Sequence, residues 1–222
     1  MKFYTNIFEK IISLENLFLA WDEFKTGKLG KYDVLEFEWN LEQNIFKLHR
    51  DLKYHKYIHG VYTKFSICDP KYRIIHKATV RDRVLHHAIY RVLSPIFEPS
   101  FISHSFSCRV DKGTHKGVGA LASFSNTVSK NNSKTCWVLK CDIKKFFDSV
   151  DQKILLDIIQ KRIKDKDSIW LIDNIIKSFS PKGQIERERE RERERVKFPA
   201  QILSSVRYGL TIRKILGFQL VI

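Results

Sequence analysis

Residues 186–195 are five consecutive Glu-Arg pairs, a run without an apolar side chain. Such a segment cannot bury a core, so a globular fold has to come from the residues that flank it. Glu and Arg three residues apart would tolerate a solvated helix, whereas like charges four residues apart oppose one. A GA dinucleotide tract read as codons would give the same peptide, which leaves an expansion or a shifted reading frame as explanations.

The chain has 40 lysines and arginines against 25 acidic residues, a formal charge of +15. This surplus indicates a polyanionic partner such as nucleic acid or an acidic membrane surface; a merely basic protein is the alternative. No apolar run approaches the roughly 20 residues that span a bilayer. The first ten residues lack the order of features of a secretory signal, so the expected location is the cytoplasm.

Cysteines and histidines show no metal-ligand spacing. Cys68, Cys108, Cys136 and Cys141 contain no Cys-x-x-Cys pair, which favours reduced, structural thiols over a zinc site or a disulfide framework. The His86-His87 pair is interpreted as ordinary surface or core residues.

Apolar spacing predicts helices in the first part of the chain. The pattern runs from Phe8 to Trp21, stops at two glycines, and resumes as an amphipathic helix over residues 34–52. The core positions expected in the second helix are Leu35, Trp39, Leu41, Ile45 and Leu48.

The middle of the chain changes character. Residues 62–75 are β-like and are interrupted by the turn signal Asp69-Pro70. Residues 80–94 are helical in pattern, and Pro95 and Pro99 predict the exit of that helix. A strand over 101–110, a helix over 114–129 and a loop at 131–133 are expected next.

Residues 136–143 are mostly apolar and predict a buried strand, near the end of which lies Asp142. A helix over 154–163, capped by Ser149 or Asp151, and another over 169–179 should follow. A carboxylate just past a strand is suited to a divalent cation, because hard cations take oxygen ligands. A lone aspartate there is more often an N-cap or a turn residue, so the interpretation of Asp142 depends on the surrounding sequence.

That string, WVLKCDIKKFFDSVD over residues 137–151, resembles the first catalytic motif of reverse transcriptases, above all the bacterial enzymes related to group II intron proteins. Further segments resemble the fingers region of the same family, in the family's order. They are DPKYRII (69–75), RDRVLHHA (81–88), PIFEPSF (95–101), SFSCR (105–109) and KGTHK (112–116).

The resemblance implies an α+β fold: a partial fingers-palm arrangement of helices around a small antiparallel sheet, with the palm incomplete. The expected divisions are an N-terminal helical extension (1–61), fingers and partial palm (62–183), the Glu-Arg repeat (184–195) and an unassigned tail (196–222). One side of such a fold should be exposed, because the strands that normally cover it are missing. An unpaired apolar edge of this kind favours aggregation.

The family also implies residue roles. Asp142 would be the catalytic metal ligand for Mg²⁺, with the backbone carbonyl of Ile143 as an auxiliary ligand. Phe147 matches the aromatic residue under the incoming sugar, where it would exclude a 2′ hydroxyl; a plain core role is the alternative, more so for its neighbour Phe146. Lys71 and Arg73 match fingers positions that hold the dNTP triphosphate.

Three further arginines, Arg81, Arg83 and Arg109, could contact template, triphosphate or a neighbouring acid. For Arg81 and Arg83, pairing with Asp82 or Glu98 is an equal alternative. Asp148 and Asp151 are better interpreted as residues that begin a helix than as metal ligands.

The chain departs from the family after Pro181-Lys182-Gly183. The Glu-Arg repeat replaces a glycine-rich segment, and no aspartate follows Asp173, so the Tyr-x-Asp-Asp-like turn with the remaining metal-binding carboxylates is absent. The leading hypothesis is therefore a truncated RNA-directed DNA polymerase domain, inactive alone, whose partners are an RNA template, a DNA primer, dNTP and a separate polypeptide that completes the palm. A non-catalytic basic RNA-binding remnant is the second hypothesis. A third, an unrelated enzyme with an isolated acidic site, has only Asp142 in its favour.

Overall fold

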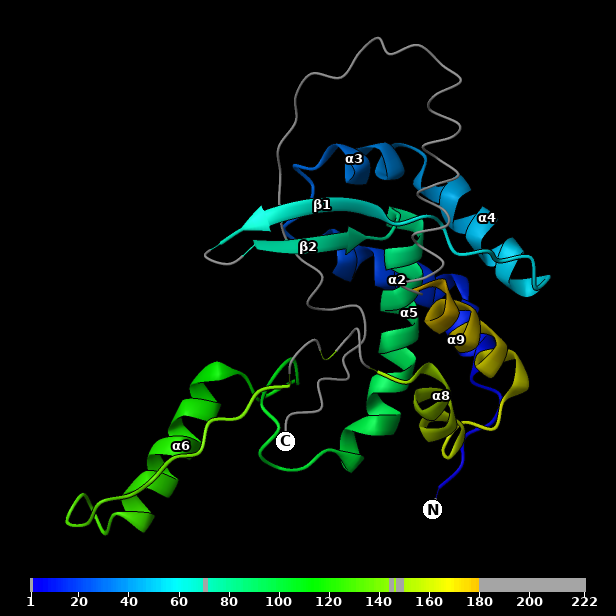
Figure 1. The fold of residues 1–222 in the computed structure, drawn as a ribbon. Helices are drawn as coiled ribbons and strands as arrows, with labels where there is room; N and C mark the ends of the chain where they lie inside the picture. The colour runs from blue at the N-terminus through cyan, green and yellow to red at the C-terminus, as the bar shows by residue number, and fades with distance from the viewer. Residues whose placement is uncertain (1, 70–71, 144–145, 147–149, 180–222) are drawn as a thin grey trace.

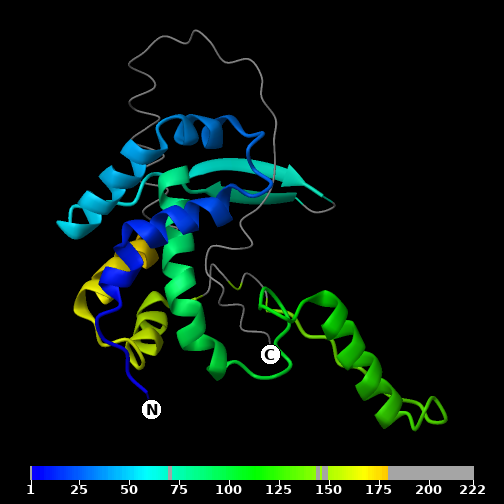
Figure 2. The ribbon, with the colours of Figure 1, turned by 180° about the vertical axis from the view of Figure 1, so that it is seen from behind.

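The computed structural model describes residues 2–69, 72–143, 146 and 150–179. Helices dominate it, and a two-stranded antiparallel sheet accompanies them, so the predicted α+β class is confirmed. Helix α5 (Val80–Phe97) runs through the centre of the body, and the sheet lies across one end of it (Figure 1). The short 3₁₀ helix η1 (Glu98–Ser100) follows α5, and α6 (Thr114–Val128) then projects away from the body in both ribbon views (Figures 1 and 2).

Four helices precede the sheet: α1 (Phe8–Ile12), α2 (Leu14–Lys25), α3 (Tyr32–Trp39) and α4 (Leu41–Lys53). Helix α2 packs against α5 (Figure 2). Ser13 separates α1 from α2 and caps the second, since its side chain accepts a hydrogen bond from the Asn16 amide. The predicted helical pattern over Phe8–Trp21 is thus confirmed, with one break.

The single helix predicted over residues 34–52 is wrong, because a break at Asn40 divides it into α3 and α4. Asn40 has φ −117° and ψ 38°, outside the helical region, so the apolar pattern does not continue in one register. Ile45 and Leu48 are buried as expected, but Leu35 and Trp39 are exposed, Trp39 to 88%. Helix α3 buries two other residues, Val34 and Phe37.

The predicted β-like segment is a hairpin of β1 (Thr63–Cys68) and β2 (Tyr72–Lys77). Its register joins Thr63 to Lys77 and Cys68 to Tyr72, so the two strands are connected by the residues between Cys68 and Tyr72, where the sequence predicts a turn. Pro70 lies outside the described residues. Two strands alone are marginally stable in water, and the hairpin therefore depends on its packing against the helices.

Helix α5 extends one turn beyond the predicted exit, with Pro95 inside it. Proline removes one backbone hydrogen bond, but the burial of Ile96 and Phe97 in the core offsets that loss. The strand predicted over 101–110 is wrong, since this segment consists of turns. The Arg109 guanidinium donates to the carbonyls of Ile102 and Ser105, both at 2.9 Å. In a strand these carbonyls would instead bond to a neighbouring strand, so the side chain of Arg109 stabilises a loop.

The last two described helices, α8 (Gln152–Gln160) and α9 (Lys166–Ser178), confirm the predicted helices near 154–163 and 169–179. Asp151 caps α8 by accepting hydrogen bonds from the amides of Lys153 and Ile154 at 2.8 and 3.0 Å. The alternative cap, Ser149, lies outside the described residues. Within the described part of the chain, no helix has the length and apolarity needed to cross a membrane.

The N-terminal helices share one hydrophobic core with α5, α8 and α9. Leu17, Leu85 and Leu171 are fully buried in the same cluster, which crosses the expected boundary between residues 61 and 62. The Asp165 carboxylate joins the two ends of this body, because it accepts hydrogen bonds from the amides of Ile7 and Phe8 at 2.9 and 2.7 Å. Burial alone would raise the pKa of Asp165. Hydrogen bonds from Phe8, Ser168, Asp167 and Ile7 together outweigh burial and hold the pKa below the ordinary value.

His86 of α5 is a core residue, one of the two interpretations left open for it. It is 4% exposed, and neither ring nitrogen has a hydrogen-bond partner among the described residues. It lines a cavity of about 50 Å³ between α5, α8 and α9. Burial, followed by the nearby His59, lowers the pKa of His86 to about 3.

This burial makes stability depend on pH. Unfolded, the imidazole binds a proton below about pH 6.5, whereas the folded protein excludes it until far lower pH, so the contribution is complete above pH 6.5 and is lost as the pH falls towards 3. We expect the free energy of unfolding to drop by about 2 kcal/mol between pH 7 and pH 5 through this group alone. Urea titrations at both pH values should show a smaller drop in His86→Leu. The exposed His115→Leu is the control, and an equal drop in His86→Leu and the parent would contradict the assignment.

Candidate nucleotide and nucleic-acid site

The strand predicted over residues 136–143, the segment that contains Asp142, is wrong. Residues 136–143 form no strand, and their side chains are largely exposed, Trp137 to 93% and Leu139 to 88%. A strand that is apolar on both faces needs a neighbouring strand and covering side chains. None of the described residues pairs with this segment, so it remains without regular structure.

The ligand set around Asp142 does not fit two magnesium ions. Its carboxylate is exposed, and the neighbouring Ile143 is exposed to 45%. The described residues contain no group of three or more His, Cys, Asp or Glu placed to hold a metal ion. A two-metal site needs several carboxylate oxygens to bridge closely spaced cations, which a single aspartate cannot supply.

Arg73 is the described member of the pair expected to hold the triphosphate. It lies on β2 next to the turn, opposite Ile67 of β1, and its side chain is exposed. Among the described residues it has no ion-pair partner, so its charge is available to a ligand. Lys71 lies outside the described residues, as do Phe147 and Asp148.

Arg81 and Arg83, at the start of α5, form ion pairs with acids of the N-terminal helices. Arg81 binds Asp51 at 2.9 Å and stacks over the Tyr57 ring, while Arg83 binds Asp33 at 2.6 Å. Ion pairing was expected, but not with these acids: Asp82 and Glu98 bond elsewhere. Burial lowers the pKa of Arg83, and Asp33 only partly counteracts it. The substrate contact predicted for Arg81 stays a prediction.

Arg109 is similarly engaged, with Glu98. The guanidinium binds the Glu98 carboxylate at 2.7 Å and lies over the Phe101 ring. With the two carbonyl contacts of the same side chain, this ties the loop after η1 to the end of α5. A role for Arg109 in nucleotide binding also stays a prediction.

Asp82 is a buried carboxylate at the centre of a hydrogen-bond network. It is completely buried and accepts hydrogen bonds from the Tyr57 hydroxyl at 2.8 Å, the Thr79 hydroxyl at 2.6 Å and the Gly60 amide at 3.0 Å. Burial, and then Asp82, raise the pKa of the Tyr57 hydroxyl, which therefore stays a donor. A side chain at Gly60 would meet Asp82 at 2.6 Å, so only glycine permits this approach.

The network positions the hairpin, because Gly60 and Thr79 flank the two strands and both bond to the first turn of α5. Sequence reasoning considered Asp82 only as a partner for arginine. The signal that could have identified it is Thr79-x-x-Asp82, since a threonine three residues before an acid marks a helix start. Here the Asp82 amide donates to the Thr79 side chain.

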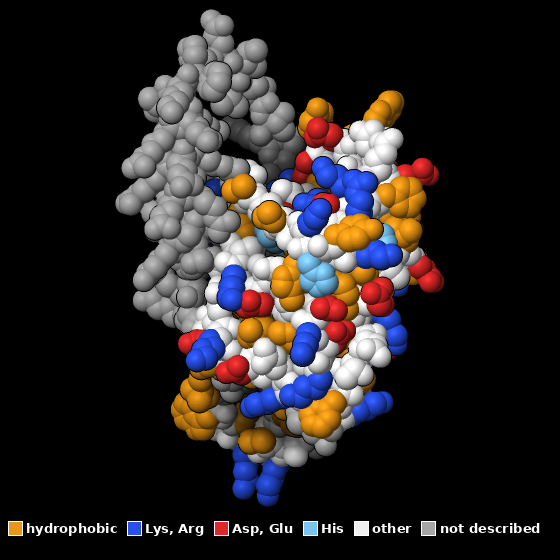
Figure 3. Space-filling view, turned by 90° about the vertical axis from the view of Figure 1, so that its right-hand side faces the viewer, with side chains coloured by type: hydrophobic (Ala, Val, Ile, Leu, Met, Phe, Trp, Pro, Cys, Tyr) orange, Lys and Arg blue, Asp and Glu red, His pale blue; other side chains and the backbone are white. Residues whose placement is uncertain are grey.

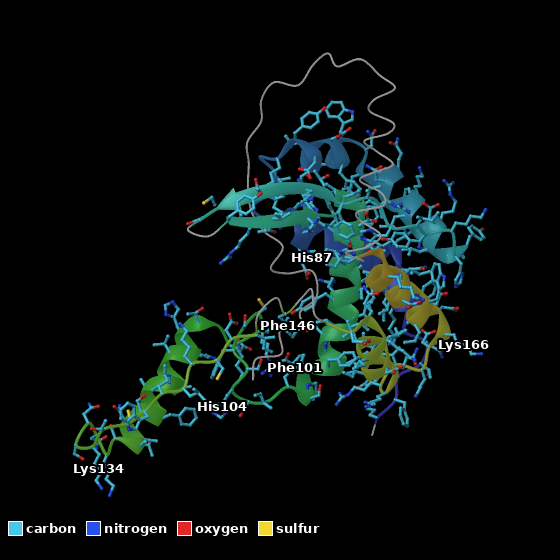
Figure 4. The ribbon with its side chains drawn as sticks, viewed as in Figure 1. His87, Phe101, His104, Lys134, Phe146 and Lys166 are labelled. Atoms are coloured by element: carbon cyan, nitrogen blue, oxygen red, sulfur yellow. The ribbon has the colours of Figure 1, made fainter. Side chains whose placement is uncertain are left out.

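Basic side chains are distributed unevenly over the molecule. On the side where α4, α8 and α9 lie, Lys and Arg side chains are interspersed with acidic and hydrophobic ones (Figure 3). In contrast, the projecting part of the chain between His104 and Lys134, labelled in Figure 4, has no acidic residue except Asp111. Lys134 lies at its far tip, on the side opposite to Lys166 of α9 (Figure 4).

Comparison with known proteins places these features in a family. A family model described as reverse transcriptase (RNA-dependent DNA polymerase) matches residues 63–203. Nuclear intron maturase 1, mitochondrial, of Arabidopsis thaliana is 30% identical over 107 residues, which is 48% of this chain and 14% of that protein. Group II intron-encoded protein LtrA of Lactococcus lactis is 28% identical over 110 residues, 49% of this chain and 17% of LtrA.

Protein YkfC of Escherichia coli is 24% identical over 108 residues, 49% of this chain and 28% of YkfC. The aligned part therefore covers less than a third of each of these relatives.

Proposed function

This chain belongs to the reverse transcriptase (RNA-dependent DNA polymerase) family, and on that premise we propose that its body forms the fingers and part of the palm of an enzyme that extends a DNA primer on an RNA template. The observation that carries the proposal is the family match over residues 63–203, a range that holds both the hairpin with Arg73 and the segment with Asp142.

Members of this family typically use divalent metal ions for nucleotidyl transfer. In the complete enzyme, Asp142 and the carbonyl of Ile143 would contribute to holding Mg²⁺, which stabilises charge on the phosphoryl oxygens. Because the carboxylates of the described residues do not make a two-metal site, we assign this chain no catalytic step of its own. Its residues bind and orient the substrates.

Two further residue roles belong to this proposal. Lys71 and Arg73 would hold the triphosphate of the incoming dNTP with charge-assisted hydrogen bonds. Removing both should weaken dNTP retention more than duplex binding. The ring of Phe147 would exclude a ribose 2′ hydroxyl, a steric form of selectivity.

A second candidate function is a non-catalytic basic RNA-binding protein. The specific observation in its favour is the lone Asp142, together with the lack of any aspartate after Asp173. Both candidates require nucleic-acid binding, and they differ only in whether the chain takes part in synthesis when the missing carboxylates are supplied.

The common requirement is tested by the salt dependence of binding. The logarithm of the binding constant for an RNA–DNA primer-template should fall linearly with the logarithm of salt concentration. The slope should be about 0.9 per phosphate contact on a duplex. In filter-binding or anisotropy titrations, Arg73→Gln should lower the retention of added dNTP and change the slope for the primer-template by less than one contact, because Arg73 is assigned to the triphosphate.

Arg50→Gln is the matched control, because Arg50 on α4 is also exposed and lacks an ion pair within the described part of the chain. Its dNTP retention and its slope should equal those of the parent. Binding that is insensitive to salt, or no binding at low ionic strength, would remove the physical basis of both candidates.

A further inference from the structure

Helix α3 and the end of α9 contact opposite faces of the hairpin at its base. Lys77, the last residue of β2, forms an ion pair with Asp33 of α3 at 2.6 Å. The preceding residue, His76, points to the other face of the sheet, because side chains alternate along a strand. Its ring meets the ring of Phe179, the residue after α9, edge-on at a centroid distance of 5.8 Å. The end of α9 therefore supports the hairpin on the face opposite to α3.

Tyr62, the residue before β1, makes a second contact with the end of α9. Its hydroxyl lies 3.0 Å from the hydroxyl of Ser178, and its ring meets the Phe179 ring edge-on at 5.6 Å. The Ser178 hydroxyl donates its own proton to the Ile175 carbonyl at 2.7 Å, so Tyr62 is the donor and Ser178 the acceptor. Ser178 is buried, which shields this hydrogen bond from competing water.

Gln152, the first residue of α8, holds the same turn of α9 from another side. Its side-chain amide donates to the carbonyls of Ile176 and Phe179 at 3.0 and 2.7 Å. Both carbonyls lie at the end of α9, where no further turn of helix supplies donors. The start of α8 thus caps α9. The hairpin base, the last turn of α9 and the start of α8 form one continuous set of contacts.

We infer that Tyr62 and Gln152 are positioning residues for the nucleotide triphosphate: through the last turn of α9 they fix the angle between the hairpin, which has Arg73, and the start of α8, which follows the motif of Asp142. This inference rests on the proposed function, since it concerns the same nucleotide site. Its novelty lies in assigning the orientation of the hairpin to two residues that are not on either strand.

The geometry of a strand makes the base of the hairpin sensitive to small movements. Arg73 lies three residues from His76 on β2, roughly 10 Å at about 3.4 Å per residue, so a tilt of about 5° at the base would move Arg73 by about 1 Å. Charge-assisted hydrogen bonds to a triphosphate depend on distances of this size. Binding of a duplex depends on many separate phosphate contacts and is much less sensitive to one of them.

The test compares two affinities of the full chain: for an RNA–DNA primer-template, and for the next complementary dNTP with magnesium on that primer-template. Tyr62→Phe removes only a hydroxyl, and Gln152→Leu removes both donors at similar size. Each should weaken dNTP retention by about threefold to tenfold, the range expected for one lost hydrogen bond, and change primer-template affinity by less than about twofold. Tyr62→Leu, which also alters the ring contact with Phe179, should weaken dNTP retention further.

The matched controls are Gln160→Leu and Tyr90→Phe. Gln160 is a half-buried glutamine at the other end of α8, and Tyr90 is a half-buried tyrosine of α5 whose hydroxyl donates to the Cys108 carbonyl at 3.5 Å. Both should leave dNTP retention within about twofold of the parent. The double variant Tyr62→Phe/Gln152→Leu should lose less than the product of the two single losses, because both residues act through the same turn of α9.

The outcomes separate this inference from the proposed function. Equal losses of dNTP retention and primer-template affinity would indicate a general loss of structure and overturn the inference. A double variant whose loss equals the product of the single losses would overturn it too, since the two residues would then act independently. If the parent retains dNTP and both single variants retain it equally well, the inference fails and the proposed function stands. A parent that retains no dNTP would remove the proposed function itself.

Discussion

Fusing residues 1–183 to the downstream half of a close relative should give templated DNA synthesis, whereas residues 1–222 should give none with magnesium and dNTP. Among the residues that the structure describes, Asp142 has no partner carboxylates that could complete a metal site, and the fusion would supply them. In the fusion, Asp142→Asn should lower synthesis by roughly 10²–10³-fold or more, because an amide lacks the anionic oxygen that binds the cations. Primer extension on an RNA template, followed on a denaturing gel, measures both.

Asp157→Asn is the control for this substitution. Asp157 is an exposed aspartate on α8 with the same change of charge, and synthesis should persist in that variant. Phe147→Ala in the fusion should keep DNA synthesis and admit ribonucleotides, since the excluding ring is removed. Robust synthesis by residues 1–222 would contradict the absence of a complete metal site. Unchanged synthesis by the fusion with Asp142→Asn would instead contradict the role of Asp142. The two hypotheses, an incomplete metal site and Asp142 as a metal ligand, are therefore tested separately.

Replacing Asp82 should produce the largest loss of stability in the body. Asp82→Ala leaves the Tyr57 hydroxyl, the Thr79 hydroxyl and the Gly60 amide without their acceptor in a buried site. Removing one member of a buried charged network typically costs about 3–5 kcal/mol, and unsatisfied buried donors account for much of it. Urea unfolding at pH 7 should show a loss of this size.

Asp157→Ala is the stability control and should change the free energy of unfolding by less than about 0.5 kcal/mol. Hydrogen exchange of the hairpin amides should accelerate in the Asp82 variant, because Gly60 and Thr79 no longer fix both ends of the hairpin. A loss of about 1 kcal/mol or less would show that the network contributes no more than an ordinary hydrogen bond.

Local signals explain where the sequence predicted the fold well. The Asp69-Pro70 turn located the hairpin, and Asp151 was correctly identified as a cap because capping depends on a few neighbouring residues. The errors arose where distant residues decide. Trp39 is exposed because the chain breaks at Asn40, and residues 136–143 form no strand because a strand needs a neighbour that the sequence of one segment cannot reveal.

The site was predictable only in part, for the same reason. The roles that motif order predicts for Asp142 and Arg73 stay predictions. The ion-pair partners of Arg81 and Arg83 lie some 30 and 50 residues away along the chain, at Asp51 and Asp33. Periodicity alone does not predict which acid meets which base. The buried role of Asp82 depends on Tyr57 and Gly60 as well as on its helix, so its own segment indicated only a helix start.

The hydrogen bond between the Ile7 amide and the Asp165 carboxylate has a consequence for folding during synthesis. The Asp165 carboxylate and the Ile7 amide that it binds are 158 residues apart in sequence. The ribosome therefore releases the first helices long before α8 and α9 emerge to cover them. Until then, apolar residues such as Phe8 lack part of their final packing, and such surface on a nascent chain favours misassembly. Folding of this body is thus completed only after α9 has emerged, and until then the nascent N-terminal helices are open to binding by chaperones.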